Sequence, residues 1–401
     1  MLEVSTQNFF MLGVAAILLI GFLGKAIAKK TKIPNVVWLI IFGLILFPVL
    51  NFVPTSTLIY YTPFASSIVI IILLFNAGLN FNIRKLFREV SRASLLAVVN
   101  FILAAIAAFL LMYFLKAGTL ASLLTGLAVG SVSAVAIPSI NRPDKSKDKS
   151  SLLVTIESTI TEPLGIILVL VVISAVLLNN YNANFIATTL ASEFSTGIVV
   201  GGLFALAWIP TMSYFQRLHY EYSYAASLAL VFIVYVLVQE IGGSGPISAL
   251  IFGLIIANGE DIYRALKYRH SSSFTLSKES KSFNDLISFI TMSFFFVYLG
   301  GLIIPNDYLY LALGVLIGLV VLITREIGTH IALFKSAFSD YDKRIISYMF
   351  SRGSGTAIIA VLPIAYGILN VGFIDIIISA ILTTIVLSGA LLTHINAQEM
   401  I

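Results

Sequence analysis

Residues 152–178 read LLVTIESTITEPLGIILVLVVISAVLL, and this stretch indicates the type of fold. A helix needs about 20 mostly apolar residues to cross the hydrocarbon layer of a membrane, and this stretch is long enough. It nevertheless carries two carboxylates, Glu157 and Glu162. Charged side chains are rare at membrane depth unless they have a partner or a function. The stretch therefore predicts a membrane helix that faces a polar interior.

The rest of the chain repeats the apolar pattern. Of the 401 residues, 59% are hydrophobic and 11% are charged, with a mean hydropathy of +1.01, whereas soluble domains carry about 25% charged residues. The apolar residues form continuous blocks, which excludes the alternating pattern of a membrane β-barrel. The absence of cysteine excludes disulfides and thiolate metal sites. The composition predicts an all-α polytopic membrane protein.

Apolar blocks bounded by charge, glycine or proline predict thirteen transmembrane helices. They are residues 9–28, 36–52, 64–79, 93–115, 120–140, 152–178, 194–212, 224–238, 247–257, 286–304, 308–334, 345–369 and 373–395. Cytoplasmic loops collect Lys and Arg, and alternate loops hold most of the 24 basic residues, with Lys116 alone in the loops of the other side. We therefore predict a cytoplasmic (cell) membrane location, an outside N-terminus and a cytoplasmic C-terminus. The net charge of +5 belongs to these loops, so no nucleic-acid partner is expected.

An odd number of helices also permits two inverted six-helix repeats around a linking helix, as in many secondary transporters. We predict one transmembrane domain over residues 1–401, with repeats at about 8–178 and 224–395 and a linking helix at 194–212. The third helix ends in LFNAGL at residues 74–79, and the tenth carries FFVYLGG at residues 295–301. This similarity between the third and tenth helices supports the repeat.

Glu157 and Glu162 should have different surroundings. Five residues turn a helix by about 500°, which leaves the two carboxylates about 140° apart. Burial favours the protonated form of a carboxyl group and a bound cation favours the ionised form, so one buried glutamate makes a proton and a cation compete. Glu162 is the candidate for this exchange, because Pro163 frees the carbonyl group of Thr159 beside it.

Two other helices carry breaks. Residues 351–356 read SRGSGT in the twelfth helix, and residues 126–133 read GLAVGSVS in the fifth. Discontinuous helices in corresponding halves indicate a transport site near the membrane midplane. We therefore predict crossed, unwound segments at these two places. Close helix packing through Gly126 and Gly130 is a second interpretation that is compatible with the first.

The remaining intramembrane charges need partners. Arg352 and Glu157 are predicted to form a structural ion pair, because either charge alone would be costly to bury. Arg325 and Glu326 form either a second internal support or a pair near a membrane face. His330 is interpreted as a satisfied interior residue rather than as a ligand.

These motifs resemble those of the monovalent cation:proton antiporter superfamily, particularly its NhaP-like sodium/proton antiporters. Members typically show Phe-Glu-x-Gly-Leu in the third helix, Thr-Asp-Pro in the fifth, Glu-Ser-x-x-Asn-Asp-Pro in the sixth and Arg-Gly in the twelfth. This chain reads FNAGL at 75–79, SVS at 131–133, ESTITEP at 157–163 and RG at 352–353. The resemblance covers nearly the whole chain in helix count, orientation and motif order.

The resemblance implies alternating-access exchange of a monovalent cation for protons, with sodium first and lithium or potassium as other substrates. Exchange would be electroneutral, because a single carboxylate remains at the site. The implied ion and proton site consists of Glu162 with Thr161, Ser131 and Ser158, and its secondary candidates are Asn76 and Ser133. A homodimer in the lipid bilayer is also implied. No enzymatic activity and no cofactor are expected.

The sequence departs from the family pattern at three places. Asn76 replaces the acid of the third helix, Val132 replaces the aspartate of the fifth, and Thr161-Glu162 replaces the Asn-Asp pair. Glutamate is longer than aspartate, and it has fewer charged neighbours here. The choice of cation therefore stays open.

Three other functions are compatible with parts of the sequence. A potassium/proton exchanger, or a transporter of another solute on the same scaffold, is the main alternative because a fold does not fix a substrate. Residues 242–245 read GGSG, which matches the Gly-x-Ser-Gly of rhomboid-like intramembrane serine hydrolases, but such chemistry needs a His beside Ser244. A sensor that has lost transport is the third.

Overall fold

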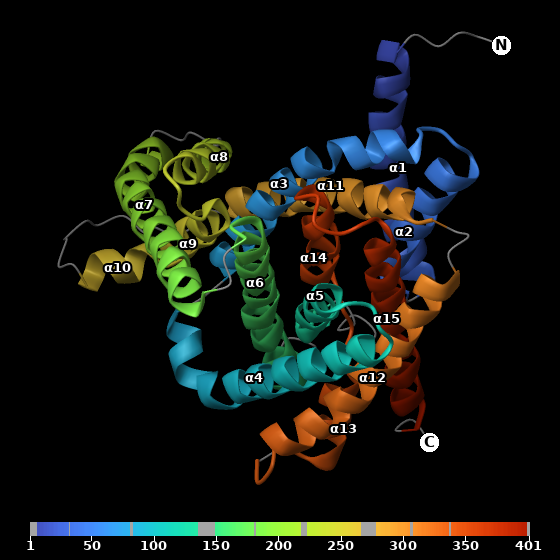
Figure 1. Ribbon diagram of the computed structural model, residues 1–401. Helices are drawn as coiled ribbons and strands as arrows, with labels where there is room; N and C mark the ends of the chain where they lie inside the picture. Colours follow the sequence, from blue (N-terminus) through green and yellow to red (C-terminus); the bar gives the residue numbers. More distant parts are fainter. Residues whose placement is uncertain are drawn as a thin grey trace. The chain divides into compact units, whose positions relative to one another are not determined.

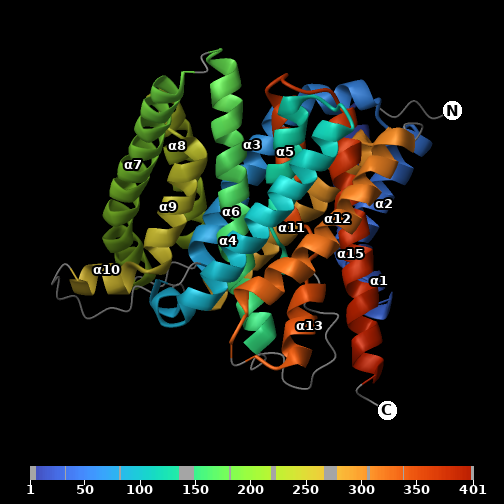
Figure 2. The same cartoon turned by 60° about the horizontal axis from the view of Figure 1, so that its bottom comes forward.

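The structure is a computed structural model that describes residues 6–31, 33–80, 83–134, 149–179, 182–217, 223–265, 278–304, 308–336 and 338–398 (Figures 1 and 2). All regular secondary structure within these ranges is helical. The chain divides into two compact units. Unit 1 comprises Met1–Ser66, Ser91–Val169 and Met292–Ile401, and unit 2 comprises Ser67–Val90 and Leu170–Thr291.

Except for the short polar helix at residues 259–265, the helices of the described residues follow the predicted apolar blocks. They are α1 (Thr6–Thr31), α2 (Asn35–Leu44) with a π-helical turn at Ile45–Val49, α3 (Thr55–Asn80), α4 (Ile83–Phe114), α5 (Thr119–Gly130), α6 (Lys149–Leu177), α7 (Ala183–Arg217), α8 (Ser223–Glu240), α9 (Gly245–Ala257), α10 (Gly259–Ala265), α11 (Lys278–Leu302), α12 (Tyr308–Ala332), α13 (Asp340–Tyr348), α14 (Ser354–Ala365) and α15 (Gly372–Gln398). The predicted twelfth helix is two helices, α13 and α14. The predicted end of the fifth helix, residues 135–140, lies outside the described residues.

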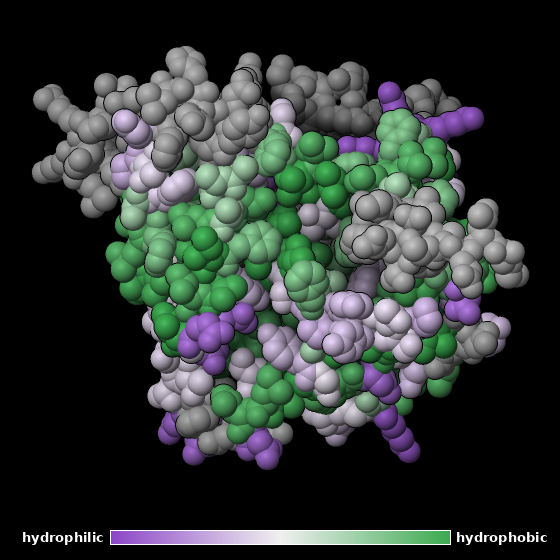
Figure 3. Space-filling view, turned by 90° about the horizontal axis from the view of Figure 1, so that it is seen from above, coloured by the Kyte–Doolittle hydropathy of each residue, from purple (hydrophilic) through white to green (hydrophobic). Residues whose placement is uncertain are grey.

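Seven helices in the described ranges are long and apolar enough to cross a membrane. These spans are Thr55–Asn80, Arg92–Phe114, Lys149–Leu177, Ala187–Met212, Ser282–Leu302, Tyr308–Ala332 and Gly372–Ile395, and shorter apolar helices accompany them. Large apolar side chains such as Leu19, Phe64 and Leu203 are exposed, and hydrophobic areas cover much of the face in Figure 3. This surface suits contact with lipid. The total of thirteen crossings stays a prediction.

Small residues let the helices of unit 1 approach each other closely. α12 packs along α15, and a Cβ atom on Gly318 would lie 2.7 Å from the Thr383 side chain. α5 and α14 contact each other, and both contact α15. The two helices next to the predicted breaks are thereby brought together.

Two helix crossings have the same backbone contacts. In unit 1, α2 meets α11 where a Cβ atom on Gly43 would collide with the Val297 carbonyl oxygen, and one on Gly300 with that of Ile40. Each glycine thus faces the carbonyl group three residues before the other glycine. Any side chain there would force the two backbones apart.

The second crossing, in unit 2, repeats this arrangement. α3 meets α9 where a Cβ atom on Gly78 would collide with the Leu250 carbonyl oxygen, and one on Gly253 with that of Phe75. Gly78 belongs to the LFNAGL motif and Gly300, in the first crossing, to the FFVYLGG motif. The matching contacts support the internal repeat, whose boundaries stay a prediction.

Unit 2 packs around α9. Helices α7, α8 and α9 contact one another, and the Trp208 indole N–H donates to Ser227 Oγ at 2.7 Å. Ser244 precedes α9 directly, with Pro246 in the first turn of that helix. The GGSG run is therefore the turn that leads into α9, and its last residue, Gly245, begins the helix.

Candidate functional site

The two broken segments cross in unit 1. After α5 the chain is non-helical at residues 131–133, and residues 349–353 separate α13 from α14. The Ser133 backbone N–H donates to the Ser351 carbonyl oxygen at 2.8 Å, and Ser351 Oγ donates to the Ser133 carbonyl oxygen at 2.9 Å. The predicted crossing of two discontinuous helices is confirmed.

Side chains from neighbouring helices satisfy other backbone groups of the crossing. Thr161 Oγ1 on α6 accepts from the Val132 N–H at 3.1 Å and lies 3.5 Å from the Val132 carbonyl oxygen. Thr384 Oγ1 on α15 accepts from the Arg352 N–H at 3.1 Å. Non-helical backbone at membrane depth needs such partners, because hydrocarbon offers none.

Glu162 lies at this crossing. Ser354 Oγ, in the first turn of α14, donates to Glu162 Oε2 at 3.4 Å, and the Ser133 side chain is hydrogen-bonded to the same carboxyl group. α14 packs against the stem of the glutamate, since a Cβ atom on Gly355 would lie 3.0 Å from Glu162 Cβ. Within the described part of the chain, hydroxyl groups approach this carboxyl group and no basic side chain forms an ion pair with it.

The other predicted ligands, Ser131 and Ser158, have different hydrogen-bond partners. Ser131 Oγ is 3.1 Å from Thr356 Oγ1 and donates to the Ala128 carbonyl oxygen at 3.3 Å. Ser158, one turn before Glu162 on α6, donates its hydroxyl to the Thr155 carbonyl oxygen at 2.9 Å. The structure thus brings Ser133 to the Glu162 carboxyl group and Thr161 and Ser131 to the adjoining backbone.

Asn76 has its contacts in unit 2. It lies on α3, and its Nδ2 donates to Ser288 Oγ on α11. Ser288 Oγ in turn donates to the Asn284 carbonyl oxygen at 2.7 Å. Asn76 therefore belongs to unit 2, whereas the crossing belongs to unit 1.

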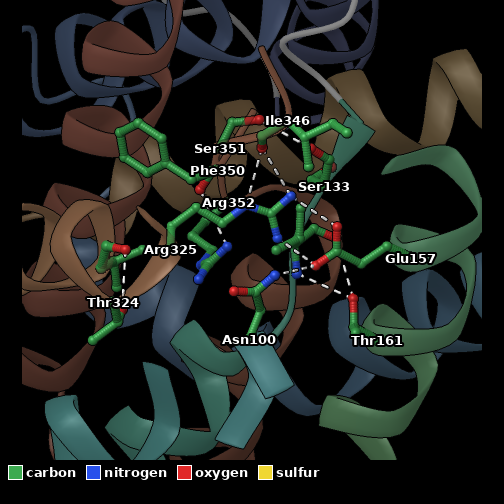
Figure 4. Close-up of polar contacts among 12 residues, drawn as sticks. Asn100, Ser133, Glu157, Thr161, Thr324, Arg325, Ile346, Phe350, Ser351 and Arg352 are labelled. Atoms are coloured by element: carbon green, nitrogen blue, oxygen red, sulfur yellow. Dashed lines mark hydrogen bonds and ion pairs between the residues drawn. The ribbon is translucent and has the colours of Figure 1, made fainter. Parts of the chain in front are cut away.

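Glu157 forms its ion pair with Arg325, which corrects the predicted pairing with Arg352. Arg325 Nη2 donates to Glu157 Oε2 at 2.8 Å, and Nη1 donates to Oε1 (Figure 4). Asn100 Nδ2 on α4 donates to Oε1 at 3.3 Å. Arg325 Nε and Nη2 also donate to the Ile346 carbonyl oxygen, at 3.2 and 3.1 Å. The fork of Arg325 on α12 matches both carboxylate oxygens, whereas the side-chain hydrogen bond of Arg352 goes to the Phe350 carbonyl oxygen.

Arg352 turns back on its own segment instead. Its guanidinium group is buried, and Nη1 donates to the Phe350 carbonyl oxygen at 3.1 Å (Figure 4). Its Nε has no hydrogen-bond partner among the described residues. Arg352 therefore hydrogen-bonds to the non-helical segment to which it belongs.

Three other polar residues of α12 differ in burial. Arg325 is an internal support, being 2% exposed, whereas Glu326 is exposed. His330 is exposed too, with Nδ1 2.8 Å from the Glu326 carbonyl oxygen, so its interpretation as an interior residue is wrong. The residue does not lie on the face of α12 that is buried.

Two residues of the site were not predicted. Asn100 is an amide within the apolar run of α4, and an uncharged polar residue at such a position is a detectable signal. Ser354 stands in the SRGSGT motif, but nothing in the motif distinguishes it from Ser351. Only the packing of α14 on α6 shows which of these serines reaches Glu162.

The sequence and the structure both match known transporters. Residues 15–397 match the family described as "Sodium/hydrogen exchanger, transmembrane". The chain belongs to this family of membrane transporters. Its resemblance to the monovalent cation:proton antiporters is thereby confirmed.

Two curated relatives illustrate the range of this family. Na(+)/H(+) antiporter 1 of Methanocaldococcus jannaschii is 27% identical over 371 residues, which cover 87% of this chain and 82% of that protein. K(+)/H(+) antiporter NhaP2 of Shewanella sp. (strain MR-4) is 27% identical over 285 residues, which cover 68% of this chain and 46% of that protein. The chain thus spans about half the length of the NhaP2 relatives that it matches.

Solved structures of a sodium proton antiporter, MjNhaP1 from Methanocaldococcus jannaschii, share the fold. The structure at pH 8 has a TM-score of 0.78 and 22% identity, and the match covers 97% of this chain and 99% of that one. An electron microscopy structure of the same antiporter has a TM-score of 0.73. The chain is a multi-pass, all-α membrane protein with the antiporter fold.

Proposed function

We propose that this protein is a secondary active antiporter that exchanges a monovalent cation, with sodium first, for protons by alternating access. The observation that carries the proposal is the position of Glu162 at the crossing, where two hydroxyl groups, those of Ser133 and Ser354, approach its carboxyl group. The family and the sodium/proton antiporter of Methanocaldococcus jannaschii support it.

Glu162 would serve as the shared site for both ions. The ionised carboxylate attracts one cation, and the protonated carboxyl group carries one proton, so the two states exclude each other. The cation-bound state and the protonated state give the site the same net charge. Exchange of one cation for one proton would therefore be electroneutral.

Glu157 is a poor candidate for the same role. Its two oxygens accept from Arg325 and Asn100, and its side chain is fully buried. Loss of this charge would leave Arg325 buried and unpaired, which is expensive. We assign Glu157 and Arg325 the task of holding α6 against α12 while Glu162 changes its occupant.

The remaining polar residues would complete the cation site. Thr161 fixes the backbone at Val132, and Ser131 holds Thr356 on α14. Hydroxyl and carbonyl oxygens of this kind are the ligands that hard cations prefer. Ser158 lies on the same face of α6 as Glu162, one turn away, and would contribute its oxygen when the cation is bound.

The arrangement in the cell is part of the proposal. The basic loops support an outside N-terminus and a cytoplasmic C-terminus in the cytoplasmic membrane. We expect the protein to work as a homodimer, as the family resemblance implies. It would need no cofactor and would catalyse no chemical reaction.

Potassium/proton exchange is the second candidate. The NhaP2 relatives are K(+)/H(+) antiporters by name. Val132 and Asn76 replace acids of the family pattern, so fewer charges attract the cation than in a typical sodium site. A transporter of another solute on this scaffold would be indicated if no monovalent cation were moved.

The test is an ion-flux assay on purified protein in liposomes. A pH gradient is imposed, and sodium, lithium or potassium is added in turn to the wild type, to Glu162→Gln and to the control Glu326→Gln. We expect cations to collapse the gradient through the wild type and the control but not through Glu162→Gln. A wild type that responds to no cation, or a Glu162→Gln variant with normal exchange, contradicts the proposal.

A further inference from the structure

The first turn of α14 forms one wall of the site around Glu162. Gly355 rests on the stem of the glutamate, and Ser354 reaches the carboxyl group itself. The following residue, Thr356, lies 3.1 Å from the Ser131 hydroxyl group on the other broken segment. Three consecutive residues of α14 thus fix the position of Ser354 relative to Glu162.

Ser354 has chemistry that suits both states of the site. Its hydroxyl group lies 3.4 Å from Glu162 Oε2, so it can donate to the carboxylate when that group is ionised. The same oxygen has two lone pairs and can become a ligand when a cation replaces that hydrogen bond. The start of α14 has no side-chain cap, and the free N–H groups of a helix N-terminus favour a nearby negative charge.

The number of oxygens matters most for small cations. A cation that enters the site gives up water, and small cations hold their water more tightly than large ones. With one carboxylate present, neutral oxygens must replace most of that water. Removing one of them should therefore weaken the binding of lithium and sodium more than that of potassium, since the number and strength of oxygen ligands contribute to selectivity.

We propose that Ser354 is a cation ligand that, together with Ser133, determines which monovalent cation binds at Glu162. This inference rests on the proposed exchange function and adds the residue that sets its ion preference. Ser354 supplies one neutral oxygen to the cation and biases the exchanger toward sodium and lithium. Ser133 supplies the second from the opposite broken segment.

Three variants test the role of Ser354. Ser354→Ala removes the oxygen, Ser354→Thr keeps it, and Ser293→Ala removes a buried hydroxyl group on α11 as a matched control. The concentration of sodium, lithium or potassium that half-collapses an imposed pH gradient is measured for each variant in liposomes. Thermal unfolding of the purified proteins checks that each is folded.

We expect Ser354→Ala to raise the half-maximal sodium and lithium concentrations about tenfold. This is the usual effect of losing one polar interaction with a charged group. Potassium should change less, so the preference for sodium over potassium falls. Ser354→Thr should restore the wild-type preference, and Ser293→Ala should keep it.

An equal loss for all three cations would assign Ser354 a purely positioning role and overturn the proposal. An unchanged preference in Ser354→Ala would overturn it as well. Failure of the exchange function itself would appear separately, as a wild type that moves no cation.

Discussion

Glu157 and Glu162 lie five residues apart on α6, yet they have different partners. Glu157 accepts hydrogen bonds from Arg325 and Asn100 and is fully buried. Among the described side chains, the hydrogen-bond partners of the Glu162 carboxyl group are the hydroxyl groups of Ser133 and Ser354. The first carboxylate has its charge compensated by the protein, whereas the second has not.

This difference separates a structural acid from an exchangeable one. A carboxylate in a bidentate pair with arginine is held in its ionised form, because protonation would leave a buried cation alone. A carboxyl group among neutral hydroxyl groups can take a proton or a cation at much lower cost. The helical twist between positions 157 and 162 creates both environments on one helix.

The largest expected effect concerns transport. Glu162→Gln should abolish cation-dependent collapse of a pH gradient, because the amide can neither release a proton nor neutralise a cation. Its melting temperature should stay close to that of the wild type, since no buried charge loses a partner. Equal transport losses for Glu162→Gln and the exposed control Glu326→Gln would show that Glu162 has no special part in exchange.

The next effect concerns stability. Arg325→Met should destabilise the protein by about 3–5 kcal/mol, the usual cost of breaking one side of a buried pair. The double variant Glu157→Met/Arg325→Met should recover most of this loss, because it leaves no charge behind. Denaturation in detergent would measure both.

Arg352→Met is the matched control for that experiment. It removes a buried guanidinium group too, but Arg352 donates to the Phe350 carbonyl oxygen rather than to a carboxylate. We therefore expect it to cost less stability than Arg325→Met. A larger loss for Arg352→Met would restore the pairing that the sequence suggests.

Asn100 provides a smaller test of the same pair. Asn100→Ala removes the amide that donates to Glu157 Oε1, and a hydrogen bond to a charged group contributes about 1.5–3 kcal/mol. We expect a loss of stability in this range with normal exchange per folded molecule. A variant that keeps full stability but loses exchange would instead connect Asn100 to the transport step.

The sequence predicts the fold well, because membrane helices are read from long apolar blocks. The glycine motifs at Gly78 and Gly300 also identify positions that make equivalent backbone contacts in the two units. The two breaks were visible as runs of glycine and serine. What the sequence does not give is the exact position of the break in the twelfth segment, because helix α13 already ends at Tyr348 and α14 begins at Ser354, within the SRGSGT run.

The site was predicted in part. An acid before a proline in an apolar helix identified Glu162, and two breaks indicated what would surround it. Whether Arg325 or Arg352 pairs with Glu157 depends on how each helix is rotated. The sequence nevertheless contains one indication of the correct partner. Arg325 shares a stripe with Gly314, Gly318 and Val321 at helical spacing, and that stripe is the buried face of α12. Glu326 and His330 fall outside it.

Thr161→Val is the mildest change that still tests how the surroundings of Glu162 differ from those of Glu157. The valine keeps the shape of the side chain on α6 but removes the oxygen that accepts from the Val132 N–H. A neutral hydrogen bond contributes about 1 kcal/mol, so the melting temperature should fall slightly. Transport should fall further than this loss of stability explains, because Val132 is followed directly by Ser133, which contacts Glu162.

The control is Thr155→Val on the same helix. Among the described contacts, the Thr155 hydroxyl group bonds only to the Ser151 carbonyl oxygen of its own helix. If both threonine variants slowed exchange equally, the backbone at Val132 would have no special part in holding the site, and the role of Glu162 would depend on α14 alone.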